Sequence, residues 1–120
     1  MNLLIVEDDR SVRSALKKVA SHYFDNIETA DSPVAAIISV DTVAPSVLVT
    51  DWNLDSELSG VEVACYARNE NPNCSIVFIT GKSLPLLKAK TKNLGVHTYL
   101  AKPFSLSSIK HVFEEILYAN

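Results

Sequence analysis

The chain has 120 residues, of which 48% are hydrophobic and 21% charged, so it is long enough for one globular domain with a buried core. A formal net charge of −3 argues against a nucleic-acid-binding surface, which would be strongly basic. No apolar run approaches the about 20 residues that span a bilayer, and the first residues lack the basic region of a signal peptide. We therefore expect a cytoplasmic protein with one domain over residues 1–120, which binds neither a membrane nor nucleic acid directly.

Five segments with strand character alternate with five segments of helical character. The predicted strands are Leu3–Val6, Asn26–Ala30, Ser46–Thr50, Ser75–Thr80 and His97–Leu100. The first of them is continuously apolar, as is typical of a strand that is buried on both faces. This alternation predicts right-handed crossovers and a parallel sheet with helices on both faces, which is the α/β class.

Capping residues and hydrophobic periodicity define the intervening helices. Their predicted starts are Asp8 or Asp9, the pair Ser32-Pro33, the capping box of Ser59 and Glu62, then Ser83 for a helix that ends at Leu94 before Gly95, and finally Ser105. The residues expected to face the core are Val12, Ala15, Leu16 and Val19, then Val34, Ile37 and Ile38, then Val61, Ala64, Cys65 and Ala67, and finally Leu106, Ile109, Val112, Phe113 and Ile116.

Polar residues suited to phosphoryl chemistry stand at the ends of four strand segments. Glu7 and Asp8 follow the first strand, Asp51 follows the third, Thr80 ends the fourth, and Lys102 follows the fifth. Ligands of a parallel sheet bind at the carboxyl ends of its strands, so we expect these side chains to form one site. Three close carboxylates repel one another, and a hard divalent cation such as Mg²⁺ relieves that repulsion.

The chemistry predicted for this site is phosphoryl transfer to a carboxylate, which holds the group as an acyl phosphate. In this interpretation Lys102 pairs with a phosphoryl oxygen and the Thr80 hydroxyl donates to another. The expected Mg²⁺ ligands are the side chains of Asp8, Asp51 and Glu7, the last directly or through water, and the main-chain carbonyl of Asn53.

These motifs resemble the receiver domain of a two-component response regulator. The match rests on IVEDD, LVTDWN, FITG and YLAKPF, and it extends over essentially all 120 residues. The resemblance implies a flavodoxin-like sheet of five parallel strands in the order 2-1-3-4-5 with five helices. It also implies that Asp51 is the phosphoacceptor, that Thr80 and Tyr99 move together as a switch, and that the Lys102–Pro103 peptide is cis.

The same resemblance implies partners. A sensor histidine kinase or a phosphotransfer protein would donate the phosphoryl group, and the signalling surface would be formed by the fourth helix, the fifth strand and the fifth helix. That surface would also serve a phosphorylation-dependent homodimer. The sequence contains no output domain, and the position of Met1, two residues before the first strand, leads us to expect a true N-terminus.

Several features depart from the family pattern or favour other functions. The loop after Asp51 reads NLDSELSG, without the usual proline and aspartate–glycine pair, although no reacting group is lost. An aspartyl-phosphate hydrolase is disfavoured because Asn53 stands where D-x-D-x-T requires a second acid. A flavin or nucleotide binder is disfavoured because acids follow the first strand in place of a phosphate-binding loop. A receiver that only docks partners is disfavoured by the complete set of acids, Thr80 and Lys102.

The remaining chemistry-bearing residues receive structural interpretations. Trp52 is predicted to be a partly exposed loop residue. The three histidines are scattered and none has a metal-ligand spacing; they are His22, His97 and His111. Cys65 and Cys74 have neither a CxxC nor a metal spacing, and we expect both to be reduced.

Overall fold

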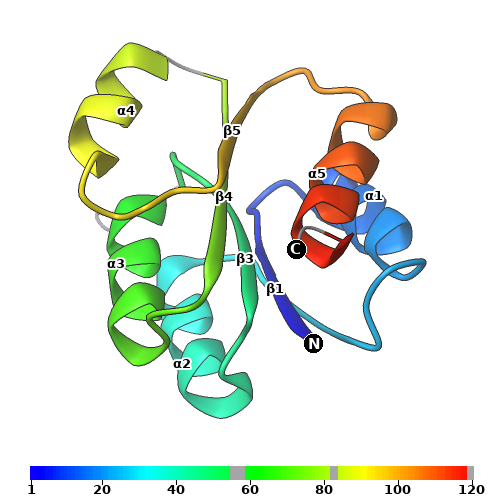
Figure 1. Ribbon diagram of the computed structural model, residues 1–120, viewed down its shortest axis with the longest axis horizontal. Coiled ribbons are helices and arrows are strands. Elements are labelled where there is room, and N and C mark those ends of the chain that lie inside the picture. Colours follow the sequence, from blue (N-terminus) through cyan, green and yellow to red (C-terminus); the bar gives the residue numbers. More distant parts are fainter. Residues whose placement is uncertain (55–58, 82–83, 119–120) are drawn as a thin grey trace.

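The computed structural model describes residues 1–54, 59–81 and 84–118, and within them five strands and five helices alternate along the chain (Figure 1). The strands are β1 (Asn2–Val6), β2 (Asn26–Ala30), β3 (Val47–Asp51), β4 (Ser75–Thr80) and β5 (Thr98–Ala101). The helices are α1 (Arg10–Ala20), α2 (Pro33–Val43), α3 (Gly60–Glu70), α4 (Leu84–Thr91) and α5 (Leu106–Tyr118). In the described part of the chain no helix has the length and apolar character that crossing a membrane requires.

All strands are parallel, and they form one sheet in the order β2-β1-β3-β4-β5, which confirms the predicted order. The chain leaves β1 for one edge of the sheet and returns to build the other half from β3. In this doubly wound arrangement the crevice for a ligand lies between the carboxyl ends of β1 and β3. The registers that set this end of the sheet are Val6↔Thr50, Asp51↔Ile79 and Thr80↔Ala101.

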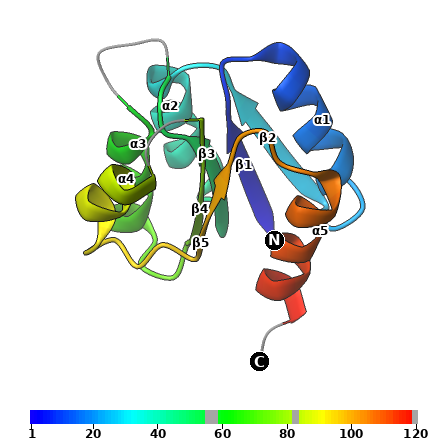
Figure 2. The ribbon, with the colours of Figure 1, turned by 90° about the horizontal axis from the view of Figure 1, so that it is seen from above.

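Two layers of helices cover the sheet (Figures 1 and 2). Helices α1 and α5 pack on one face, and α2, α3 and α4 pack on the other. Alternate residues of each central strand enter opposite cores: Leu3 and Ile5 face α1 and α5, whereas Leu4 and Val6 face the other layer. Both faces are therefore apolar, which explains the uninterrupted hydrophobic run of β1.

Helix starts follow the predicted caps. The side chain of Asp9, not that of Asp8, caps α1 by accepting from the main-chain N–H groups of Ser11 and Val12. Ser32 caps α2, and Ser59 with Glu62 forms the predicted capping box of α3. The predicted first residue of the fourth helix, Ser83, lies outside the described residues, and α4 ends at Thr91, not at Leu94.

Several predicted core positions are wrong. Val34 and Ile38 in α2 are 61% and 62% exposed, and Ala15, Cys65 and Leu106 are also exposed. Helix α2 carries apolar residues on almost every side, so its periodicity does not identify the face that packs on the sheet. Its buried residues are Pro33, Ala36 and Val40.

Trp52 is buried, with 8% of its surface exposed, and the prediction of a partly exposed residue is wrong. Its main-chain N–H donates to the carbonyl of Ile79 at 3.0 Å, which continues the pairing of β3 and β4 by one residue. Trp52 therefore keeps the alternation of the strand and packs in the same core cluster as Leu48.

Arg68 in α3 connects three main-chain carbonyls from two turns. Its Nη1 donates to Pro72 at 2.7 Å, its Nε to Leu94 at 2.9 Å, and its Nη2 to Gly95 at 3.2 Å. Because α4 ends at Thr91, Gly95 does not cap the helix as predicted; it lies in the turn before β5 with a φ of 65°, a left-handed conformation that glycine adopts readily, and its carbonyl faces the guanidinium. The turn that joins α4 to β5 is thus fixed to α3.

Candidate functional site

The carboxyl ends of β1 and β3 bring three carboxylates together. Glu7 and Asp8 follow β1, and Asp51 is the last residue of the neighbouring strand β3. Each of these residues offers a carboxylate oxygen, and the three oxygens lie within 4.8 Å of one another. Such a set of hard oxygen donors fits a divalent cation of the Mg²⁺ class, so the cluster could hold a metal ion.

The ammonium group of Lys102 lies between two of these acids. Its Nζ is 2.6 Å from Glu7 Oε1 and 2.7 Å from Asp51 Oδ2. The main-chain N–H of Lys102 donates to the carbonyl of Thr80 at 2.7 Å, which extends the pairing of β4 and β5 and fixes the lysine at this edge. The Lys102–Pro103 peptide is cis, as the family resemblance implied.

The site contains one acid that is hard to ionise. Glu7 is 1% exposed, and burial raises its pKa to about 7; the hydrogen bond from Lys102 opposes this shift, while Asp8 and Asp51 add to it. Burial lowers the pKa of Lys102, but its hydrogen bonds to Asp51 and Glu7 outweigh that effect, so its pKa is raised. Lys102 is therefore a permanent positive charge at neutral pH, while Glu7 titrates near neutrality in the metal-free protein.

The main chain on both sides of Asp51 is held in place by the start of α3. The N–H of Gly60 donates to the carbonyl of Trp52 at 2.8 Å. A Cβ atom at Gly60 would lie 1.9 Å from the carbonyl oxygen of Asp51 and 2.9 Å from Thr50 Oγ1. Only glycine fits here, because the helix start touches the backbone of the phosphoacceptor candidate.

The main-chain N–H of Asn53 donates to Asp51 Oδ1 at 3.2 Å. Its carbonyl as a metal ligand remains a prediction. The loop residues 55–58, where the sequence departs from the family pattern, lie outside the described residues.

Thr80 is fully buried at the end of β4 and is paired in register with Ala101 of β5, one residue before Lys102. A Cβ atom at the next residue, Gly81, would lie 3.8 Å from the Cβ of Lys102, which is an ordinary van der Waals contact. The sheet thus brings the predicted hydroxyl and ammonium groups to adjacent strand ends.

Tyr99 connects β5 to α4 on the neighbouring part of the sheet. Its ring stacks on Phe78 with a centroid distance of 6.1 Å and an interplanar angle of 13°, and Lys88 Nζ lies 5.5 Å from its centroid. Its hydroxyl is 2.6 Å from Thr91 Oγ1, which also lies 2.8 Å from the carbonyl of Leu87. The single hydroxyl hydrogen of Thr91 is used toward Leu87, so the Tyr99 hydroxyl donates to Thr91.

Arg13 supports the acidic turn and was not identified as a site residue from the sequence. Its Nη1 donates to the main-chain carbonyl of Glu7 at 2.8 Å and contacts that of Asp8 at 3.4 Å. The only signal was its position in the first turn of the helix that follows the acids. A charge at this position orients the main chain from which both acids project.

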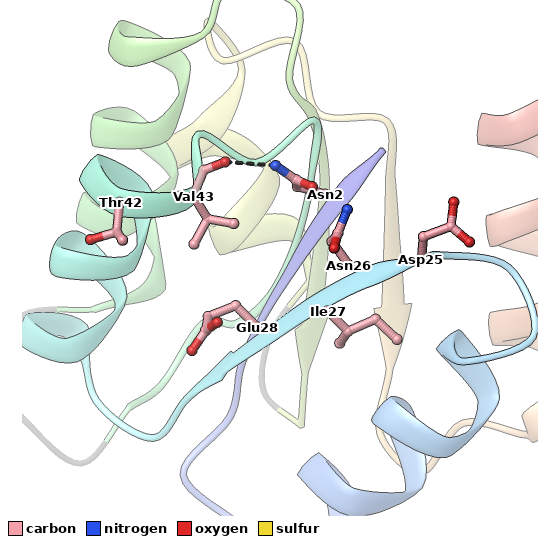
Figure 3. A pocket seen from close by; sticks show the side chains of 7 residues that line it. All are labelled: Asn2, Asp25, Asn26, Ile27, Glu28, Thr42 and Val43. Carbon is pink, nitrogen blue, oxygen red and sulfur yellow. Dashed lines mark hydrogen bonds between the residues drawn. The ribbon is translucent and has the colours of Figure 1, made fainter.

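Two of the surface hollows formed by described residues differ in their distance from the acidic site. One, of about 500 Å³, borders the acidic site and is lined by Ser11, Val12, Ala15, Lys102, Pro103, Phe104 and Leu106. The other, of about 510 Å³, lies at the amino ends of β1 and β2, at the opposite end of the strands (Figure 3). There the side-chain amide of Asn2 donates to the carbonyl of Val43 at 2.8 Å. This second hollow is remote from the strand ends that carry the acids.

Known proteins are similar to this chain in sequence. The family model described as response regulator receiver domain matches residues 3–114. The chemotaxis protein CheY1 of Helicobacter pylori (strain J99) is 31% identical, and the alignment covers 100% of this chain and 99% of CheY1. The response regulator MprA of Mycobacterium avium (strain 104) is 29% identical over 91% of this chain, which spans about half of that relative (47%).

A solved structure agrees in fold. The crystal structure of a CheY-like response regulator receiver domain protein from Methanospirillum hungatei JF-1 has a TM-score of 0.88 and 20% identity, covering 98% of this chain and 93% of that one. At this identity the likeness concerns the fold alone, and the family assignment rests on the sequence matches. With three clustered carboxylates and Lys102 at the strand ends, the chain belongs to the response regulator receiver domain family of two-component signalling proteins, and it is a signalling domain rather than a catalytic one.

Proposed function

We propose that this domain accepts a phosphoryl group on Asp51 from a phosphohistidine of a partner sensor histidine kinase or phosphotransfer protein. The observation that carries this proposal is the environment of Asp51. Its carboxylate lies 2.7 Å from the ammonium of Lys102 and within 4.8 Å of two further carboxylates. A lone acid at a strand end would lack both the cation that pairs with a phosphoryl oxygen and the donors that hold a metal ion.

In the transfer step a carboxylate oxygen of Asp51 attacks phosphorus. The new O–P bond forms as the N–P bond to the donor imidazole breaks, and the imidazole nitrogen keeps that electron pair and takes up a proton. Lys102 then leaves the Asp51 carboxylate and pairs with a phosphoryl oxygen, and Thr80 donates to another. Glu7, Asp8, Asp51 and the Asn53 carbonyl would hold Mg²⁺, which would supply positive charge that stabilises the phosphoryl oxygens.

A largely apolar hollow beside Lys102 supports a macromolecular donor. The hollow that borders Lys102 is formed by the start of α1 and by the segment that leads from β5 to α5, and its lining includes Val12, Phe104 and Leu106. Leu106 is 54% exposed, so an apolar side chain is available to a partner directly beside the site. A protein that delivers a phosphohistidine can bury this surface as it approaches.

Phosphorylation would act on the surface formed by α4, β5 and α5. Thr80 moves toward the phosphoryl group, and Tyr99, two residues before Ala101 on the paired strand, changes its contacts with α4. The direct hydrogen bond between Tyr99 and Thr91 supports this coupling, because it joins β5 to α4. The same surface would mediate a phosphorylation-dependent homodimer or bind a downstream effector.

The proposal is tested by labelling with acetyl phosphate in the presence of Mg²⁺ or EDTA. We expect acetyl phosphate to add one phosphoryl group per chain in Mg²⁺ and none in EDTA. The label should be stable in acid and removed by hydroxylamine, as an acyl phosphate is. Asp51→Asn should lose the label. Asp25→Asn, an exposed acid in the opposite hollow, is the matched control and should label like the wild type. Equal labelling of Asp51→Asn would disprove the assignment.

A further inference from the structure

Two histidines that are distant in sequence meet one carboxylate where β5 and α5 pack together. His97 immediately precedes β5, and its Nε2 lies 3.5 Å from Glu115 Oε1. His111 lies one turn before Glu115 in α5, and its Nε2 is 3.5 Å from Glu115 Oε2. The carboxylate is therefore held between two imidazole rings, although each contact is longer than a good hydrogen bond.

Imidazole nitrogen and carboxylate oxygen are the donors that Zn²⁺ and related borderline metals select. We propose that His97, His111 and Glu115 form a second cation site, distinct from the acidic cluster, for a divalent transition metal such as Zn²⁺. Three protein ligands leave a fourth position to water. The all-oxygen set of Glu7, Asp8 and Asp51 suits hard cations, so the two sites differ in the metal that they prefer.

The positions of the ligands suit chelation. His111 and Glu115 are at i and i+4, so they project from the same face of α5. His97 is fixed by its main chain, whose N–H donates to the carbonyl of Ile76 at 2.8 Å. The three donor atoms do not lie within 4.8 Å of one another in this arrangement, so metal binding requires side-chain rotation. The His111 side chain is 74% exposed and that of Glu115 47%, so neither is confined by packing and both can turn toward His97.

Binding at this site would connect an edge strand to a helix. β5 lies at the edge of the sheet. The acidic cluster meets its carboxyl end through Lys102, whereas His97 stands at its amino end. A metal ion that binds only the folded arrangement would stabilise the protein by an amount that rises with the logarithm of the ratio of its free concentration to its Kd, and it would tie β5 to α5.

The experiment is a calorimetric Zn²⁺ titration of the full chain in a Cys65→Ser background, since the exposed thiol of Cys65 would bind the same metals. Excess Mg²⁺ is present throughout to occupy the acidic cluster. We expect one Zn²⁺ per chain and a higher melting temperature with Zn²⁺. Co²⁺ in place of Zn²⁺ should give the visible absorption bands of a site with nitrogen ligands.

Variants decide which residues hold the ion. His97→Ala and His111→Ala should each weaken Zn²⁺ binding by at least about tenfold, since each removes one of three ligands. His111→Gln changes an exposed side chain and preserves the test if His97→Ala does not fold. His22→Ala is the matched control and should bind like the parent. Unchanged affinity in His111→Gln, or equal loss in His22→Ala, would overturn the proposal.

Asp51→Asn separates this site from the phosphoacceptor site. It should bind Zn²⁺ like the parent while it loses the acetyl phosphate label. Loss of Zn²⁺ binding in this variant would place the ion in the acidic cluster and overturn the second site. Conversely, labelling of Asp51 does not depend on His97 or His111, so a failure of the proposed function would leave the zinc result unaffected.

Discussion

Glu7→Gln should stabilise the metal-free protein at pH 8. Glu7 is buried, and its pKa of about 7 compares with an ordinary value of 4.5. That difference corresponds to about 3 kcal/mol by which ionisation of Glu7 destabilises the fold. Glutamine resembles the protonated acid, but its NH₂ group next to the Lys102 ammonium offsets part of the gain. We expect an increase of about 1–2 kcal/mol in the free energy of unfolding at pH 8.

The pH dependence gives the sign of the effect. Because the pKa is raised in the folded state, the folded protein binds the Glu7 proton more tightly than the unfolded chain does. The stability that this proton contributes is complete below about pH 4.5 and is lost as pH rises through about 7. The advantage of Glu7→Gln should therefore be absent near pH 5 and reach its full size near pH 8.

The assay is urea unfolding in EDTA at pH 5, 6, 7 and 8, followed by the fluorescence of the buried Trp52. Glu70→Gln, which changes an exposed acid, is the matched control and should show little change across this range. Mg²⁺ should stabilise the wild type more than Glu7→Gln at pH 8, since the variant lacks one ligand. An equal difference at pH 5 and pH 8, or a less stable variant at pH 8, would refute the charge-based reasoning.

Three further predictions concern contacts outside the acids. Gly60→Ala should lower the free energy of unfolding by about 2–3 kcal/mol and weaken Mg²⁺ binding, because the added Cβ would lie 1.9 Å from the Asp51 carbonyl oxygen. Urea unfolding measures the first effect and a Mg²⁺ titration the second. Thr91→Val and Tyr99→Phe should show a coupling of about 1 kcal/mol in a double-mutant unfolding cycle, whereas additive losses would deny the hydrogen bond. Arg68→Lys should lower the free energy of unfolding by about 1–2 kcal/mol, because an ammonium group cannot donate to all three carbonyls that the planar guanidinium reaches. An unchanged urea midpoint would contradict this.

The sheet and the convergence of the site were predictable because parallel topology converts strand-end residues into neighbours. Glu7, Asp51, Thr80 and Lys102 are separated by up to 95 positions, yet each follows or ends a strand of one sheet. The order of the strands was implied by the family resemblance. What the sequence did not provide is the distribution of charge: repulsion was expected among all the acids, whereas Lys102 pairs with Asp51 and burial acts mainly on Glu7.

Side-chain burial was predicted less well, for reasons that differ by element. In α2 nearly every side is apolar, so Val34 and Ile38 were assigned to a core that their helix reaches with other residues. Trp52 was taken as a loop residue because the strand was expected to end before it, while its N–H still pairs with β4. Periodicity identifies a buried face only where the opposite face is polar.

The contact of His97 and His111 with Glu115 was not predictable from spacing. Metal motifs are recognised when the ligands stand at short, regular separations, and His97 lies outside α5 altogether. Only the packing of the β5 start against the carboxyl-terminal half of α5 brings the first histidine to the helical pair.

The Arg68 contacts determine how α4 can move. The guanidinium holds the carbonyls of Leu94 and Gly95 just beyond the carboxyl end of the helix, and the Thr91–Tyr99 hydrogen bond holds its last turn against β5. With that end held to α3 through Arg68, we expect any rotation of α4 to be centred near its carboxyl end. A displacement grows with distance from Arg68 and is largest at the amino end of the helix, so a probe placed at Leu84 would report a rotation that one placed near Thr91 would miss.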